Sequence, residues 1–302
     1  MKLQLSENIE GWIFLRVESD KLEEYLKYYK SKDCDTIGIA VSRFHGYKLD
    51  DLNFLSSIPQ LKALYLQDSI PGISTIQSLN ELQWLLLPES KQKLDLSNFP
   101  KLEVIRGSWN SKLKNLSSCN SLHTISLSKY NPINKDIREF SYLSKLEELE
   151  INQSTIECLK GVEKIANLRS LEVSYMPRLQ DISSISGLKC SLEKLRFRNC
   201  KKVASFEVID ELEHLKELGI NNCGDVTSIK FIEYLKRLEH FSFVNTNVVN
   251  GDLSPCLKLK NLRHVGFLDK RHYSHKLSEI EANLKSRSKK KGLPSDFVIT
   301  EI

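Results

Sequence analysis

The sequence reads LEKLRFRNC over residues 192–200 and LKELGINNC over residues 215–223. Both stretches follow one rule: a leucine, two residues, an apolar residue, one residue, and a second apolar residue. Apolar residues two positions apart lie on the same face of a β-strand. Each stretch therefore predicts a short strand with one buried face, which a single unit cannot cover by itself.

The same phrase begins at ten leucines, spaced 20 to 24 residues apart. They are Leu61, Leu82, Leu102, Leu122, Leu146, Leu168, Leu192, Leu215, Leu238 and Leu262. A period in this range is the signature of stacked repeats that share one core. A weaker match at residues 34–42 predicts an eleventh strand. Because a stacked repeat protein presents a continuous surface, we expect its function to lie on that surface.

The phrases, together with segments such as 182–188 that follow the strand, resemble leucine-rich repeats of the internalin-like, bacterial type. The resemblance covers residues 34 to 270. It implies an α/β solenoid, curved into a right-handed superhelix, with a parallel β-sheet on the concave face and short helical or irregular convex segments. One departure concerns the position that usually holds Asn, which is Asn in only one of the ten repeats.

The ends of the chain differ from the repeats. Residues 12–17 predict a strand and 20–30 a helix with Asp20 as its N-cap, so residues 1–33 are expected to form an N-terminal cap. Residues 271–302 are expected to form a C-terminal cap helix and a basic tail. The uninterrupted repeats between them favour one elongated domain, although 302 residues would suggest two on length alone.

Strand residues that alternate with the apolar ones point to the opposite face of the sheet. In the first repeats this pattern predicts a cluster of apolar side chains there, with a nearby cation. The members that we predict to contact a partner are Tyr65, Trp84, Leu86, Arg106 and Trp109. Clustered aromatic residues are typical anchors of protein interfaces. The alternative is that the N-terminal cap or a loop folds over them.

The middle repeats carry charges on the same face. The predicted partner-binding residues there are Glu148, Glu150, Glu172, Lys194, Arg196 and Arg198. The repeat register places Glu172 beside Arg196 and Lys194 beside Glu217. Opposite charges side by side could orient a charged partner, or could pair with one another on an exposed sheet, where each pair contributes little.

Chemistry-bearing motifs are missing from the sequence. It has no nucleophile elbow, phosphate-binding loop, zinc-protease or dinucleotide motif, so we expect no enzyme activity, cofactor or metal. His240 and His264 should be neighbours, but no Asp, Glu or Cys completes a metal site. Seven cysteines without a Cys-x-x-Cys pattern predict free thiols, among them Cys200 and Cys223 one strand apart.

The sequence therefore predicts a monomeric, non-enzymatic module that binds another protein through its concave face. Neither a membrane-spanning run nor a secretory signal is apparent, which favours the cytoplasm. A bacterial immunity protein that neutralises a toxin is the leading hypothesis, and a regulatory or scaffold subunit of an enzyme such as a phosphatase is the alternative. A net charge of +5 does not favour nucleic acid, but the basic patch on residues 194–198 and the tail at 285–291 keep that hypothesis open.

Overall fold

The computed structural model describes residues 5–8, 10–31 and 37–290, with side chains up to residue 287. These residues form two compact units. Unit 1 comprises Met1–Asn134 and Arg138–Ser154, and unit 2 comprises Lys135–Ile137 and Thr155–Ile302. Each unit is described separately below.

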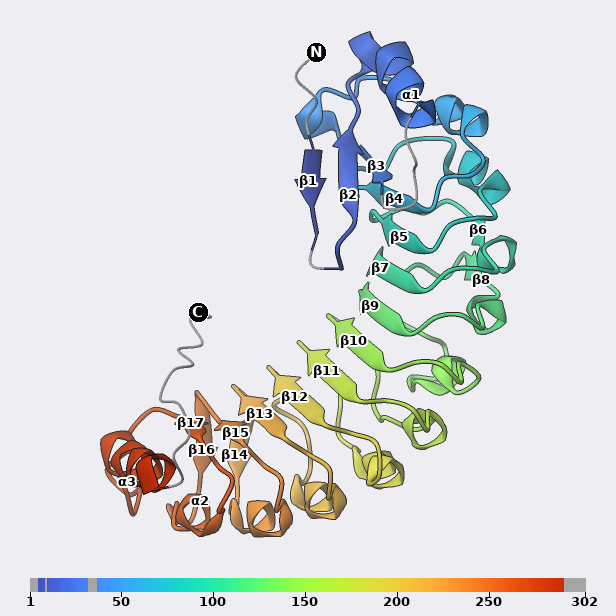
Figure 1. Cartoon of the computed structure of the whole chain (residues 1–302). Coiled ribbons are helices and arrows are strands. Elements are labelled where there is room, and N and C mark those ends of the chain that lie inside the picture. The colour runs from blue at the N-terminus through green and yellow to red at the C-terminus, as the bar shows by residue number, and fades with distance from the viewer. Residues whose placement is uncertain (1–4, 9, 32–36, 291–302) are drawn as a thin grey trace. The chain divides into compact units, whose positions relative to one another are not determined.

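Unit 1 contains one main sheet, whose strands follow one another in chain order (Figure 1). They are β1 (Leu5–Glu7), β2 (Ile13–Arg16), β3 (Ile37–Val41), β4 (Ala63–Leu66), β5 (Trp84–Leu87), β7 (Val104–Ser108), β9 (Thr124–Ser128) and β10 (Glu148–Asn152). β1 and β2 pair antiparallel, and every later pair is parallel. β6 (Leu94–Asp95) and β8 (Leu113–Lys114) form a second, two-stranded sheet.

Unit 2 repeats the parallel arrangement without a hairpin at its start. Its main strands are β11 (Ser170–Ser174), β12 (Lys194–Arg198), β13 (Glu217–Asn221), β15 (His240–Ser242) and β17 (His264–Gly266). β14 (Gly224–Val226) pairs with β16 (Thr246–Val248). The register is that of the repeat phrase, since Leu171, Leu195 and Leu218 lie side by side on consecutive strands.

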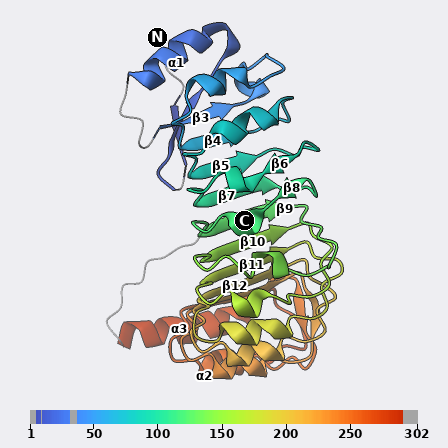
Figure 2. The same cartoon turned by 90° about the vertical axis from the view of Figure 1, so that its right-hand side faces the viewer.

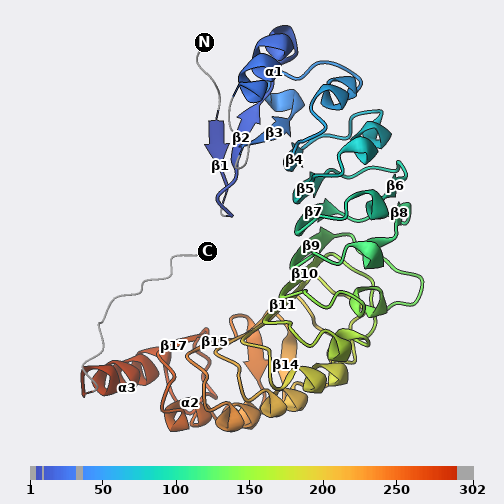
Figure 3. The same cartoon turned by 45° about the vertical axis from the view of Figure 1, so that its right-hand side comes forward.

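The core of each unit lies between the sheet and a row of 3₁₀ turns, which stack along the side away from the main strands (Figures 1 and 3). In unit 1 the turns of this row are Asn53–Ser57, Ile73–Ser78, Leu96–Asn98, Leu116–Ser118 and Arg138–Phe140, whereas the turn Arg43–His45 directly follows β3. In unit 2 they are Val162–Lys164, Ser183–Leu188, Glu207–Glu211 and Lys230–Tyr234. The ten repeat leucines are all buried.

The turns are 3₁₀ rather than α-helical because of repeat length and apolar spacing. A 3₁₀ helix has three residues per turn, so residues three apart share a face. In one turn Ile182, Ile185 and Leu188 follow this spacing and are buried. A side chain closes the start of the turn: the Asp181 carboxylate accepts the Ser183 N–H at 2.8 Å, and this bond holds the pKa of Asp181 below its usual value.

The helices at the two ends form close to where the sequence predicts them. α1 (Leu22–Lys30) follows a 3₁₀ turn at Ser19–Lys21, so Asp20 is not its N-cap; Lys21 holds that position without a side-chain cap bond. At the other end α2 (Pro255–Lys258) precedes α3 (Leu277–Lys290), which lies beside it (Figure 2) and contacts β17. The end of the basic tail lies outside the described residues. No helix among those residues is both long enough and apolar enough to cross a membrane.

The structure explains why Asn is rare at the position where leucine-rich repeats usually hold it. Asn199, Asn222 and Asn245 occupy the position one residue earlier than the family position, with φ of 53° to 57°. Asn tolerates this left-handed conformation better than most residues. The next residue then points into the core, where Thr246 donates to the Ile220 carbonyl at 2.5 Å and accepts the Cys223 N–H at 2.9 Å. Hydroxyl and thiol groups therefore make the core-side bonds at these positions.

Candidate protein-binding face

We call the side of each main sheet that faces away from the 3₁₀ turns its open face. In unit 1 the N-terminal hairpin covers the first part of that face. Asn8 closes the hairpin, because its side chain accepts the backbone N–H groups of Glu10 at 3.2 Å and Trp12 at 2.8 Å. The Glu10 carboxylate lies 2.6 Å from the guanidinium of Arg106 on β7. Residues 96 positions apart are thus joined across the open face.

Beneath the hairpin the open face carries a second apolar cluster. Its buried members are Phe14, Ala40, Ala63, Trp84 and Val104, and Trp12, Tyr65 and Leu86 pack against it half-buried. The Phe14 ring lies 5.0 Å from that of Trp84 and 5.9 Å from that of Tyr65. Only 2% of Trp84 is exposed. The expectation of an exposed Trp84 anchor is therefore wrong, and the alternative, cover by the N-terminal cap, describes this structure.

Gly38, paired with Phe14 across β2 and β3, lets the Phe14 ring lie close over β3. A Cβ atom at this position would lie 2.7 Å from a ring carbon of Phe14 and 2.8 Å from the Cβ of Ala63. Separations below 3.0 Å require a neighbour to move, so any larger residue would push the Phe14 ring away from the cluster. Small residues at 38, 40 and 63 thus make room for the large rings of Phe14 and Trp84.

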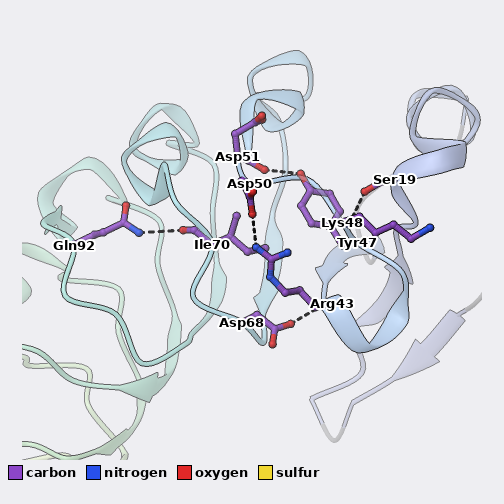
Figure 4. A network of polar contacts seen from close by, with 9 residues as sticks. All are labelled: Ser19, Arg43, Tyr47, Lys48, Asp50, Asp51, Asp68, Ile70 and Gln92. Atoms are coloured by element: carbon purple, nitrogen blue, oxygen red, sulfur yellow. Dashed lines mark hydrogen bonds and ion pairs between the residues drawn. The ribbon is translucent and has the colours of Figure 1, made fainter.

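Polar contacts hold the segment after β3 together, and one of them, between Lys48 and Ser19, joins it to the N-terminal cap (Figure 4). The Arg43 guanidinium lies 2.6 Å from Asp50, and the Lys48 N–H donates to the Ser19 hydroxyl at 2.7 Å. The Tyr47 hydroxyl donates to the Asp51 carbonyl at 2.6 Å. The cap is therefore bonded to the repeats both here and across the open face.

Trp109, the last aromatic residue predicted to bind a partner, lies just beyond β7. Its ring is half-buried and meets Tyr130 edge-on at 5.4 Å. Its backbone N–H donates to the Ser128 carbonyl at 2.9 Å. Trp109 thus contributes to packing at the edge of the sheet, and only part of its ring is accessible.

Beyond the hairpin, the open face of unit 1 is polar. Ser126 on β9 donates to the Glu150 carboxylate at 2.7 Å, and the Ser108 and Ser128 hydroxyls lie 3.1 Å apart. Glu148 is exposed. The two predicted binding residues of β10, Glu148 and Glu150, therefore lie on accessible surface.

In unit 2 the open face carries a cross-strand ion network centred on β12. Arg196 lies 3.5 Å from Glu172 on β11, and its guanidinium binds Glu217 on β13 through two nitrogens. The predicted neighbours are confirmed by the register. The predicted role of Lys194 changes, however, because Glu217 bonds Arg196 instead. Among the described residues, the structure shows no ion pair for Lys194 or Arg198.

Solved structures with the same arrangement of repeats are known. An internalin from Listeria monocytogenes has a TM-score of 0.61 at 17% identity, over 77% of this chain and 67% of its own. A leucine-rich-repeat protein from Leptospira interrogans has a TM-score of 0.60 at 18% identity, over 83% of this chain and 76% of its own. This chain has the leucine-rich-repeat fold. No protein-family model and no curated protein matches the sequence, and at these identities the likeness establishes the fold alone.

Two histidines lie on adjacent strands of this leucine-rich-repeat sheet, as its register predicts. His240 and His264 are paired residues of β15 and β17, with ring centroids 6.3 Å apart. Within the described residues, no group of three or more His, Cys, Asp or Glu side chains could hold a metal ion. His240 is half-buried, and burial lowers its pKa below 6.5, although the charge of Glu217 opposes that shift.

This pKa shift predicts a pH dependence of stability. Because the folded state disfavours protonated His240, the unfolded state binds more protons just below pH 6.5. Stability should therefore rise as the pH rises through this window and be lost as the pH falls. We expect His240→Gln to reduce the difference between denaturant midpoints measured at about pH 5 and about pH 7.5. His264→Gln, at the more exposed ring, is the control, and an equal reduction in both variants would contradict the role assigned to His240.

The cysteines of the leucine-rich repeats are free thiols where the structure describes them. Cys119, Cys200, Cys223 and Cys256 are buried. Burial raises the pKa of Cys119 and of Cys256 to about 12, and a hydrogen bond with Cys223 together with burial raises the pKa of Cys200. Protonated, buried thiols are poor nucleophiles. Cys34 lies outside the described residues.

Some surface features had no counterpart in the sequence prediction. Glu10 and Phe14 cover the open face, but they precede the first repeat, so the repeat period could not place them. Tyr175 is half exposed and lies directly after β11. The sequence prediction gives Tyr175 no role, although Asn fills the equivalent position in the next three repeats.

Proposed function

We propose that this leucine-rich-repeat protein is a non-enzymatic binding module that recognises another protein through its uncovered open face. In unit 1 the uncovered strands of the open face are β9 and β10, and in unit 2 they are β11, β12, β13, β15 and β17. The observation that carries the proposal is a difference in side-chain burial between the first strands and the later ones. Side chains on the first strands are buried under the hairpin, whereas Glu148, Arg198 and His264 are exposed.

The chemistry of this face supports binding rather than catalysis. Interfaces use charged and polar groups to fix register and exposed apolar or aromatic groups to supply affinity. Both kinds are accessible here, since Val244 is exposed near His264 and Leu268 is exposed two residues after β17. The buried thiols of Cys119, Cys200 and Cys223 are hydrogen-bonded to backbone carbonyl groups, which makes them poor candidates for nucleophiles.

Our specific proposal is a cytoplasmic, monomeric bacterial immunity protein that occludes the active surface of a toxin. The free thiols of adjacent Cys200 and Cys223 support a reducing compartment. Irregular repeats such as these resemble bacterial members more than regular eukaryotic regulators. A toxin encoded beside this gene, inhibited in an activity assay by the purified protein, would support the proposal, and a complex with an enzyme that stays active would favour a regulatory subunit.

The general proposal is tested by capture of a partner from a lysate of the source organism. We expect Glu148→Lys combined with Leu268→Arg to abolish capture of a protein that the wild type retains, because both residues are exposed on the open face. The matched control combines Glu211→Lys with Tyr234→Arg, which are exposed on the 3₁₀ turns. Both variants change the net charge equally, so a partner lost only with the control would contradict the proposal.

A further inference from the structure

Lys194, Arg196 and Arg198 occupy every second position of β12, so all three lie on the open face of unit 2. Their surroundings differ. Arg196 is held between two carboxylates, those of Glu172 and Glu217. These three side chains are 19% to 31% exposed, so the network is half-buried. An arginine bound on both sides is satisfied within the sheet, and a partner would have to displace a carboxylate in order to bind it.

Arg198 lacks such neighbours. The residues paired with it on β11 and β13 are Ser174 and Asn221, which carry no charge. The Asn221 side chain is already used, because it donates to Ser242 at 3.0 Å and accepts the Val244 N–H at 2.8 Å. Arg198 is exposed, so its guanidinium is available to an outside anion.

The turn after β12 carries two more cations, three and four residues after Arg198. Asn199 turns the chain with φ of 56°, and Lys201 and Lys202 follow it, both exposed. Asp225 holds the position equivalent to Lys202 in the next repeat, but its carboxylate accepts a hydrogen bond from Asn247 at 3.0 Å. Arg198, Lys201 and Lys202 thus form a basic cluster in which, among the described residues, the structure records no ion pair as it does for Arg196.

An exposed aromatic ring borders the cluster. Tyr175 follows β11 with φ of 56°, and its backbone N–H donates to the Arg198 carbonyl at 2.8 Å. Half of Tyr175 is exposed. Tyrosine and arginine are the residue types that contribute most often to interface hot spots, because they combine large contact area with hydrogen bonding. Here Tyr175 directly follows the strand adjacent to that of Arg198, and a backbone hydrogen bond joins the two residues.

We propose that Tyr175, Arg198, Lys201 and Lys202 form the site for an acidic segment of the partner protein. This inference rests on the proposed function and names the chemistry of the partner. A segment rich in Asp and Glu would pair with the three cations and lay an apolar side chain on the Tyr175 ring. A nucleic acid fits less well, because its continuous phosphate backbone would pass the carboxylates of Glu172 and Glu217 on either side of Arg196.

The test uses two fluorescent probes: a short peptide of alternating Glu and Asp with one Leu, and a single-stranded oligonucleotide of equal charge. We expect the peptide to bind the full chain more tightly than the oligonucleotide. Arg198→Glu with Lys202→Glu should weaken peptide binding by at least about tenfold, and Tyr175→Ala by about fivefold. The control, Lys189→Glu with Lys230→Glu, reverses two exposed charges near the 3₁₀ turns and should leave peptide binding unchanged.

Peptide binding that is equal in the Arg198→Glu, Lys202→Glu variant and its control would overturn this inference. So would tighter binding of the oligonucleotide that the same variant abolishes, since that result assigns the cluster to nucleic acid. Capture from the lysate separates this inference from the proposed function. A partner that survives Arg198→Glu with Lys202→Glu but not Glu148→Lys with Leu268→Arg would refute only the basic site.

Discussion

Trp84→Ala is expected to lower the free energy of unfolding of unit 1 by about 3–5 kcal/mol, the range for deleting a large buried aromatic side chain. The ring is 2% exposed and packs between Phe14 and the sheet. Its removal would leave a cavity under the hairpin that the rigid strands cannot close. Chemical denaturation followed by circular dichroism measures the effect, because this signal does not depend on the fluorescence of Trp84.

The matched control for this prediction is Phe44→Ala. Phe44 is an aromatic residue of the same unit, but 86% of it is exposed. We expect this substitution to change the unfolding free energy by less than about 0.5 kcal/mol. Similar losses in the two variants would contradict the burial assigned to Trp84.

Gly107→Ala is expected to be at least as costly, about 3–5 kcal/mol, because backbone strain adds to a steric clash. Gly107 has φ of 116°, a conformation that alanine rarely adopts. A Cβ atom there would lie 1.9 Å from the Leu87 carbonyl oxygen on the paired strand. The backbone of β5 or β7 would have to move, and the denaturant midpoint of unit 1 should fall accordingly.

Gly72→Ala separates the two contributions at Gly107. Gly72 also has positive φ, 79°, but its nearest neighbour would be 3.8 Å from the added carbon. Only the strain remains, so we expect a loss of about 1 kcal/mol. If the two alanine variants unfold at the same denaturant concentration, the close approach of Gly107 to Leu87 is not what requires glycine.

The period of the sequence predicts the fold well because each repeat meets only its neighbours. Once ten phrases align, the register of every parallel strand and the facing direction of each side chain follow. His240 beside His264 and Glu172 beside Arg196 are pairs obtained in this way. The N-terminal hairpin is different, because its contact between Glu10 and Arg106 has no periodic counterpart.

The sequence also does not predict which of two neighbouring cations a carboxylate will bind. Glu217 is paired in register with Lys194, yet its carboxylate bonds Arg196, one position further along the face. A guanidinium can bind carboxylates on both sides through separate nitrogens, whereas an ammonium is a point charge. Strand register predicts which side chains are close, but the geometry of each donor decides which pair forms.

Because the N-terminal cap covers the open face of the first strands, a partner is expected to bind to the later strands instead. Tyr65, Trp84, Leu86 and Arg106 contribute to the contact with the N-terminal cap. Glu172 and Arg196 neutralise each other within the sheet. Of the residues predicted from sequence to bind a partner, Glu148, Glu150, Lys194 and Arg198 remain in the proposed interface, and Tyr175, Lys201 and Lys202 join them.

Site-specific photo-crosslinking to the captured partner tests the central claim most directly. A benzoylphenylalanine side chain would replace Tyr175 or Leu268 on the open face, Tyr234 on a 3₁₀ turn, or Phe44 on the loop after β3, all of which are exposed. We predict crosslinks to the partner from positions 175 and 268 and none from 234 or 44. Crosslinks confined to positions 234 and 44 would contradict binding through the open face.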